Sequence, residues 1–206
     1  MSLTIRPATA ADLSALHPLI ERAYRGAPAR LGWTHEADLL RGPRTSVAAL
    51  AEIIADPAQT MLVAVEGEDG NVGAAGVTEA GMDGASGPEN DKSEGVSSTI
   101  TVDGTIVACV QVSDLGGIAY LGQLAVEPAR QADGLGRTML AAAEAYARGL
   151  GATRVEMTVI ADRTELIAYY QRRGYDLTGE KRPFPYEASI AGAVLHMVVM
   201  ARTLVR

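Results

Sequence analysis

Apolar residues that alternate, or that recur every three to four positions, divide the chain into strands and helices. The stretch SLTIRP, residues 2–7, alternates and ends in Pro7, which predicts an edge strand. LSALHPLIERAY carries apolar residues at helical spacing and predicts an amphipathic helix capped by Thr9. THEADLL and TSVAALAEIIADP predict two further helices, and TMLVAVEGE predicts a strand. Asp103-Gly104 predicts a hairpin turn that leads into TIVACVQV.

The second half of the chain is more regular. AYLGQLAV predicts a strand, LGRTMLAAAEAYARGLG a helix ending at Gly149 or Gly151, and TRVEMTVI another strand. RTELIAYYQRRGY predicts a helix ending near Gly174, before the extended stretches YDLTGEKRPF and VLHMVVMARTL. The apolar face of the longest helix is predicted to hold Leu135, Met139, Ala142, Tyr146 and Leu150. This order of elements predicts an α/β body with a mixed sheet.

Length and charge point to a single globular domain over residues 1–206. The chain is 48% hydrophobic, which supplies a core, and its net charge is −7. Eight acids and one lysine lie between Glu66 and Glu94, so that segment alone carries the whole imbalance. Residues 68–97 are rich in Gly, Ser and acids, and we expect a flexible insertion there. With no basic stripe and 4% aromatic residues, no nucleic-acid partner is expected.

Compartment follows from what the chain lacks. No apolar run approaches the ~20 residues that span a bilayer, so no membrane association is expected. The start, MSLTIRPATA, has no basic flank followed by an apolar run, so no secretory signal is expected either. The single cysteine, Cys109, lies in an apolar run and is expected to be a buried strand residue. We therefore expect a cytoplasmic protein without a disulfide or a metal site.

A glycine-containing turn, QADGLG over 131–136, separates LAVEP from the start of the longest helix. The dinucleotide fingerprint G-x-G-x-x-G fails because its third glycine falls on Met139. The Walker A pattern fails because Gly136 is followed by Arg137, and its outer glycine falls on Gln131. From the glycines alone, a plain strand-to-helix turn that binds nothing is equally compatible.

The motif Q-x-x-G-x-G in this setting resembles the GNAT superfamily of N-acetyltransferases. IRPATAADL at 5–13, LAVEP at 124–128 and AYYQRRGY at 168–175 extend the resemblance over roughly residues 3–180. The resemblance implies the GNAT fold, an α/β (α+β) architecture with a mixed, mostly antiparallel sheet of six to seven strands. About four helices would flank this sheet, and the acidic Gly-rich insertion would interrupt it.

The resemblance implies acetyl-CoA as cosubstrate, with the pyrophosphate held by backbone amides at a helix start. The pantetheine arm would pair with a strand that splays from its neighbour. Arg163 stands where many members carry an asparagine, and could reach a phosphate or the pantetheine. Asp133 would repel a pyrophosphate unless it points to solvent, and Arg130 and Arg137 could offset that repulsion. The implied cofactor-binding residues are Leu124, Ala125, Val126, Gln131, Ala132, Asp133, Gly134, Leu135, Gly136, Arg137, Thr138 and Arg163.

The resemblance also implies catalytic and acceptor-binding residues. Tyr170 matches the tyrosine that protonates the leaving thiolate, although its spacing alone fits a core tyrosine. Tyr120 falls where members often place a strand Glu or His, and we expect it to orient a water. Glu36 is the next candidate base or cation-attracting group, although a solvated first-turn acid fits as well. Trp33 could supply an apolar wall, so the predicted substrate residues are Trp33, Glu36 and Tyr120.

The predicted function is transfer of an acetyl group from acetyl-CoA to a primary amine of a small molecule or peptide. The amine would attack directly in a ternary complex, without a metal. A non-catalytic acyl-CoA-binding sensor or interaction module on the same fold is the alternative. Dimers are common in the family, so a homodimer is one expected state.

Overall fold

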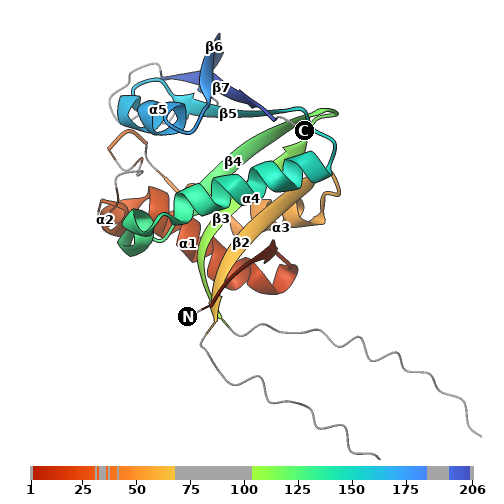
Figure 1. Ribbon diagram of the computed structural model, residues 1–206. Coiled ribbons are helices and arrows are strands. Elements are labelled where there is room, and N and C mark those ends of the chain that lie inside the picture. The colour runs from red at the N-terminus through yellow and green to blue at the C-terminus, as the bar shows by residue number, and fades with distance from the viewer. Residues whose placement is uncertain are drawn as a thin grey trace, which may run out of the picture.

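A computed structural model describes residues 2–30, 32, 36, 38–40, 42–67, 104–184 and 195–204. It contains a seven-stranded sheet with helices on both faces (Figure 1). The strands are β1 (Ser2–Pro7), β2 (Gln59–Gly67), β3 (Thr105–Asp114), β4 (Ile118–Val126), β5 (Arg154–Ile160), β6 (Asp176–Pro183) and β7 (His196–Thr203). The helices are α1 (Leu13–Tyr24), α2 (Gly26–Ala29), α3 (Val47–Ala55), α4 (Leu135–Gly149) and α5 (Thr164–Gln171), with 3₁₀ turns at Ala10–Asp12 and Pro128–Asp133.

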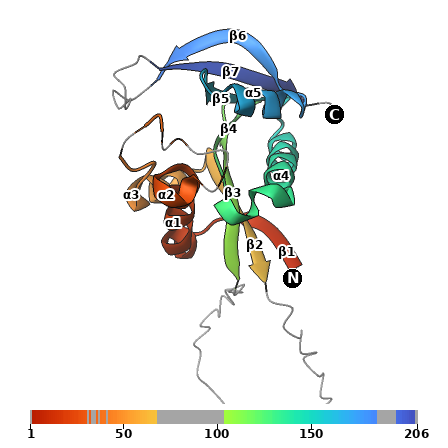
Figure 2. The same ribbon diagram turned by 90° about the vertical axis from the view of Figure 1, so that its left-hand side faces the viewer.

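The sheet has the strand order β1-β2-β3-β4-β5-β7-β6. In the described sheet β4 and β5 run parallel, whereas every other neighbouring pair is antiparallel. β4 pairs with β5 only over residues 118–120, so the remainder of β4 leaves its neighbour (Figure 2). A register shift against β3 and a positive φ of 44° at Gln123 mark the point of departure. This divergence opens the middle of the sheet.

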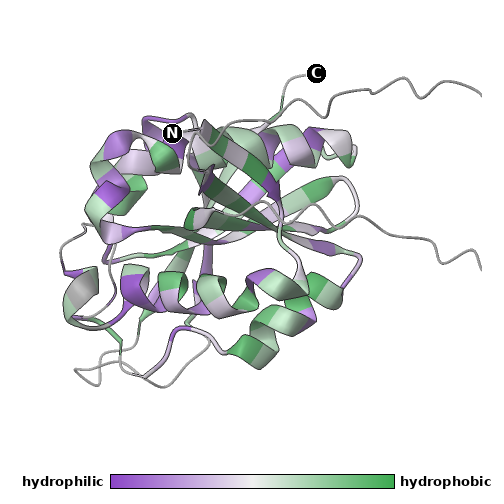
Figure 3. Ribbon diagram, turned by 90° about the horizontal axis from the view of Figure 1, so that it is seen from below, coloured by the Kyte–Doolittle hydropathy of each residue, from purple (hydrophilic) through white to green (hydrophobic). Residues whose placement is uncertain are grey.

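The sheet is covered on both faces, which explains the continuous apolar run in β2. Leu62 and Ala64 face α4, whereas Met61, Val63 and Val65 face α1 and α3. The view from below shows hydrophobic strands lying between helices (Figure 3). The buried residues on these two faces of the sheet form two hydrophobic clusters of the core.

Helix starts and stops follow local chemistry. At the start of the first helical segment, the backbone N–H of Thr9 donates to Asp12 at 2.7 Å. The N-cap of α3 is Ser46, whose hydroxyl accepts from Ala49 N–H at 3.1 Å. After α4, Gly151 adopts a φ of 85° and closes the helix. No helix in the described part of the chain is long and apolar enough to cross a membrane.

Two sequence expectations were wrong in detail. The buried face of α4 is centred on Met139, Ala143 and Ala147, whereas the predicted Leu150 is 43% exposed. Of the predicted face, Leu135 and Met139 are buried, and the buried face continues through Ala143 and Ala147 and not through Ala142 and Tyr146. THEADLL is not a helix in its described residues: Leu40 N–H donates to Glu36 C=O in one turn.

The confirmed fold is the mixed, mostly antiparallel sheet of the GNAT architecture. The described residues form seven strands and five α-helices, one helix more than the predicted four, because α2 adds a single turn in GAPA. Asp103 and the insertion 68–97 lie outside the described residues. The predictions of a hairpin turn and of a flexible insertion, and that of a single domain over the whole chain, therefore stay predictions.

Candidate active site

A slot lies beside the end of β4, between the start of α4 and α5. Its volume is about 50 Å³, and its described lining is Tyr24, Leu124, Val126, Gln131, Gly136, Leu166, Tyr169 and Tyr170. Glu127 N–H donates to the carbonyl oxygen of Val107 on β3. Because backbone groups alternate in direction along a strand, those of Ala125 also point toward β3, and the N–H and C=O groups of Leu124 and Val126 point toward the slot. Of the three predicted strand residues, two therefore present their backbone to the slot.

Tyr24 closes one part of this edge. It is the last residue of α1, and its hydroxyl donates to the carbonyl oxygen of Leu124 at 2.6 Å. Burial raises the pKa of Tyr24, so the hydroxyl stays a donor. Sequence reasoning missed this residue, because its spacing only continues the apolar face of α1.

The glycine turn has two separate structural requirements. Gly134 adopts a φ of 81°, which favours glycine, and α4 begins at the next residue. A Cβ added at Gly136 would lie 2.8 Å from the hydroxyl of Tyr169, so this position needs a close approach. The amides of Arg137 and Thr138 donate to Gly134 C=O, at 3.0 and 3.1 Å. These two bonds engage the amides of Arg137 and Thr138, so the helix-start amides left for an anion are those of Leu135 and Gly136.

Arg130 and Asp133, two charged residues of the glycine turn, form an ion pair that also includes Glu66. Arg130 forms ion pairs with Asp133 and, at 2.7 Å, with Glu66, and the Asp133 side chain is 47% exposed. One guanidinium faces two carboxylates, so Arg130 compensates the charge of Asp133 only in part, and the exposure of Asp133 to solvent further reduces its repulsion of an anion. The remaining predicted turn residues, Gln131 and Ala132, lie in the 3₁₀ turn before Gly134.

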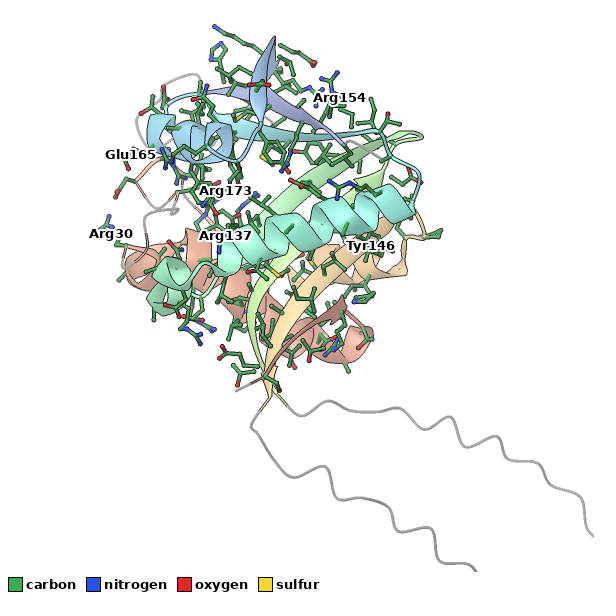
Figure 4. The ribbon with its side chains drawn as sticks, in the orientation of Figure 1. Arg30, Arg137, Tyr146, Arg154, Glu165 and Arg173 are labelled. Carbon is green, nitrogen blue, oxygen red and sulfur yellow. The ribbon has the colours of Figure 1, made fainter. Side chains whose placement is uncertain are left out.

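Two arginines flank the slot mouth from opposite helices. Arg137 is exposed at the start of α4, and Arg173 follows α5 (Figure 4). The Arg173 guanidinium stacks on the Tyr169 ring at 3.3 Å from its centroid and donates to Tyr169 C=O at 2.8 Å. Sequence reasoning missed Arg173, although the pair of arginines in QRRGY was a signal.

Tyr170 on α5 lines the slot. It is 7% exposed and packs edge-on against Tyr169 and Tyr175, with ring centroids 5.3 and 5.9 Å away. Burial raises its pKa, so the hydroxyl remains protonated. No described residue hydrogen-bonds this hydroxyl, which can therefore donate to a group inside the slot.

Two further cavities lie near the slot. The smaller, of about 110 Å³, shares Tyr24, Leu124 and Tyr170 with it. The larger, of about 550 Å³, lies toward α3 and opens to solvent. Both of these cavities are lined by Glu36, Arg44, Tyr120, Gln123, Thr158 and Met197. We name these two spaces together the acceptor cavity.

The predicted acceptor-side residues meet here, with one exception. The Glu36 carboxylate lies 2.7 Å from Arg25 and 3.6 Å from Arg44, so its charge is already compensated. The Tyr120 hydroxyl is 2.7 Å from Thr158 Oγ1, and Arg163 lines the smaller space. Trp33 lies outside the described residues. The structure thus brings Glu36, Tyr120, Arg163 and Tyr170 to one place, without testing their roles.

Comparisons with known proteins agree with this architecture. The model of the acetyltransferase (GNAT) family matches residues 83–175, which include β4, the glycine turn, α4 and α5. This match and the fold confirm the predicted resemblance to the GNAT superfamily, and support acetyl-CoA-dependent acetyl transfer in general. Among curated proteins, no sequence matches the chain.

Solved structures share the fold at low identity. The ribosomal-protein-S18-alanine N-acetyltransferase of Escherichia coli matches with a TM-score of 0.64 and 16% identity, covering 100% of this chain and 96% of its own. PaiA N-acetyltransferase of Thermoplasma acidophilum, in complex with coenzyme A, matches with a TM-score of 0.60 and 14% identity, covering 99% and 100%. Ard1 of Thermoplasma volcanium matches with a TM-score of 0.63 and 14% identity, covering 100% of both chains.

Proposed function

We propose that the protein is an N-acetyltransferase that moves an acetyl group from acetyl-CoA to a primary amine of a small molecule or peptide. One observation carries the proposal. The unpaired edge of β4 joins the glycine turn to Tyr170 and to the acceptor cavity, since the slot and the smaller cavity share their lining.

The residues of the slot fit acetyl-CoA. The backbone of Leu124 and Val126 does not pair with β5, although Tyr24 occupies the Leu124 carbonyl, and it suits an extended chain that carries amide groups, as an edge strand suits a peptide. The first amides of α4, with Arg137 and Arg173, suit a diphosphate. The cosubstrate supplies an activated thioester, and the coenzyme A in the Thermoplasma acidophilum neighbour supports this assignment by analogy of fold.

The chemistry is a direct acyl transfer in a ternary complex. The amine nitrogen forms a C–N bond with the acetyl carbonyl carbon while the C–S bond breaks. The thiolate that leaves takes its proton from the hydroxyl of Tyr170, which is the acid in this proposal, and the proton that the new amide nitrogen gives up returns to the Tyr170 oxygen.

The amine must arrive without its extra proton, since an alkylammonium has a pKa of about 10.4. The Tyr120–Thr158 hydroxyl pair is placed to orient a water that accepts this proton. Glu36 is the weaker candidate base, because Arg25 already compensates its carboxylate. Its role in the proposal is to hold the wall of the acceptor cavity.

A non-catalytic acyl-CoA-binding module is the second candidate. Two observations favour it: Asp133 stands in the glycine turn, and Glu36, the one carboxylate among the described residues that line the acceptor cavity, is ion-paired. Both functions use the same slot, so binding alone does not separate them. Release of free thiol in the presence of an amine does.

The test begins with a thermal melt with and without acetyl-CoA. At 100 times its Kd a ligand adds about 2.7 kcal/mol to stability, a shift of several degrees. We expect that shift in the wild type and a smaller one in Arg173→Ala. Arg172→Ala is the matched control, because Arg172 is the exposed neighbour. Absence of any shift contradicts both candidate functions.

Turnover is then measured as thiol release with a panel of primary amines. Acetylation of an amine supports the transferase, whereas binding without turnover supports the module. The cytoplasmic location and the homodimer stay predictions, to be tested by fractionation and by sedimentation.

A further inference from the structure

Gln123 combines two unfavourable features at the wall of the acceptor cavity. Its φ is 44°, the one positive value at a non-glycine residue in the described chain. Its side-chain oxygen Oε1 is buried and accepts no hydrogen bond from any described group. Strained backbone and an unpaired buried acceptor each cost stability and concentrate at functional positions. Both occur here, where β4 leaves β5 and where the residue lines the acceptor cavity.

A row of side-chain amides leads to this residue across the sheet. Gln59 on β2 donates from Nε2 to Asp56 Oδ2 at 2.6 Å. Gln111 on β3 donates from Nε2 to Gln59 Oε1 at 2.6 Å. Gln123 on β4 donates from Nε2 to Gln111 Oε1 at 3.3 Å. We name these four residues the amide relay.

The carboxylate at the far end fixes the direction of every amide in the relay. A carboxylate only accepts, so Gln59 must turn its NH₂ to Asp56 and its oxygen to Gln111. Hydrogen bonds from Gln59 and from Ala58 N–H hold the pKa of Asp56 below its usual value, which keeps it ionised at neutral pH. Gln111 must in turn direct its NH₂ to the oxygen of Gln59, and Gln123 must direct its NH₂ to the oxygen of Gln111. The side-chain oxygen of Gln123 is therefore left without a described partner.

We propose that Gln123 Oε1 receives an N–H of the acceptor amine and positions its nitrogen for attack. The proposal rests on the acetyltransferase function above. A neutral oxygen suits this task, since it holds N–H without favouring the ammonium form as a carboxylate does. The one carboxylate among the described residues that line the acceptor cavity, Glu36, is compensated by Arg25. Gln123 is thus a specificity-determining residue, and Asp56, Gln59 and Gln111 are positioning residues.

The experiment compares Gln123→Met, Gln123→Glu and Gln59→Met with wild type. The probe is the amine acetylated fastest from a fixed panel of glycine, L-lysine, ethanolamine, putrescine and an alanine-terminated peptide. We expect Gln123→Met to raise the KM for the amine about tenfold, with the KM for acetyl-CoA unchanged. Gln59→Met should raise the amine KM less. Gln171→Met, an exposed glutamine on α5, is the control.

A pH profile separates recognition from a merely structural role. Gln123→Glu should move the rise of kcat/KM to higher pH, because a carboxylate stabilises the ammonium form. An unchanged amine KM in Gln123→Met, or an unmoved profile in Gln123→Glu, overturns the proposal. If the wild type binds acetyl-CoA but acetylates no panel amine, the proposed function fails with it. If the wild type turns over and Gln123→Met matches it, only the present inference fails.

Discussion

The hydroxyl of Tyr24 and the carbonyl oxygen of Leu124 are hydrogen-bonded at 2.6 Å across the inner edge of β4. Tyr24 lines both the slot and the smaller part of the acceptor cavity, so this bond lies between the two spaces. The Arg44 guanidinium lies over the Tyr24 ring, with its carbon atom 4.9 Å from the ring centroid, and the backbone carbonyl of Tyr24 accepts a hydrogen bond from Glu36 N–H. One side chain thereby connects the proposed cofactor edge to the acceptor wall.

Removing this hydroxyl should strengthen acetyl-CoA binding. In Tyr24→Phe the Leu124 carbonyl is left for an amide of the bound cosubstrate. A hydrogen bond contributes about 0.5–1.5 kcal/mol net, so Kd should fall about two- to tenfold in calorimetry. Tyr146→Phe is the matched control, because its hydroxyl bonds Thr60 at 2.9 Å outside the site. An unchanged or larger Kd would show that the hydroxyl does not compete.

A methyl group added to a glycine should be tolerated at the last residue of α4, Gly149, and not at Gly134, which precedes the helix. Gly134→Ala places Cβ on a residue with a φ of 81°, and should lower stability by about 1 kcal/mol. Gly149→Ala meets nothing within 4 Å and has no positive φ, so it should be neutral or stabilising. Urea unfolding of both variants checks this. Equal effects would mean that Gly134 has no conformational role.

The sequence predicted elements whose signal is local. The continuous apolar run of β2, the helical period of α1 and the glycine after α4 each depend on neighbours within a few positions. The motif located the glycine turn in the same way. The buried face of α4 was misplaced in part because the side of the helix that packs on the sheet depends on tertiary contacts, which no local pattern contains.

Residues that act through distant contacts were not predictable from the sequence. Tyr24 and Leu124 are 100 positions apart, and Gln59 and Gln111 are 52 apart. Glu36 was found as an acid near the site, but its pairing with Arg25 depends on how α1 ends. Trp33 lies outside the described residues, so its predicted role stays a prediction.

Acid should remove the stabilising contribution of Asp12. Arg6 donates to both carboxylate oxygens at 2.8 Å, and chiefly this bond lowers the pKa of Asp12 from 3.8 to about 2. A lowered folded-state pKa stabilises the protein above pH 3.8 and loses that effect as pH falls through about 2. Asp12→Asn should cost about 1 kcal/mol at neutral pH.

Denaturant unfolding at pH 7 and near pH 2 checks this expectation. The difference between Asp12→Asn and wild type should shrink in acid. Asp38→Asn is the control, since the Arg30–Asp38 pair is 61% exposed on both sides and should contribute little. A difference that is the same at both pH values would contradict a charge-dependent contribution.

Charge in the acceptor cavity should favour an amine that carries an acid group. Among its described lining residues are Arg25, Arg44 and Arg163 against one carboxylate, Glu36. Glycine should therefore have a KM about fivefold lower than glycinamide, because a solvent-exposed ion pair contributes up to about 1 kcal/mol. Salt should reduce the difference, and so should Arg163→Gln. A preference for glycinamide would contradict a cationic acceptor site.

Tyr170→Phe should lower kcat about 100-fold while leaving the Kd for acetyl-CoA nearly unchanged, because the hydroxyl acts on the leaving thiolate. Burial raises the pKa of Tyr170 above its usual value of 10, so the acid form persists through alkaline pH. The wild-type kcat profile should accordingly rise with amine deprotonation and show no fall up to about pH 10. Tyr169→Phe should change acetyl-CoA affinity instead, since its hydroxyl lies against Gly136. If kcat is unchanged in Tyr170→Phe, the residue packs the core and some other group protonates the thiolate.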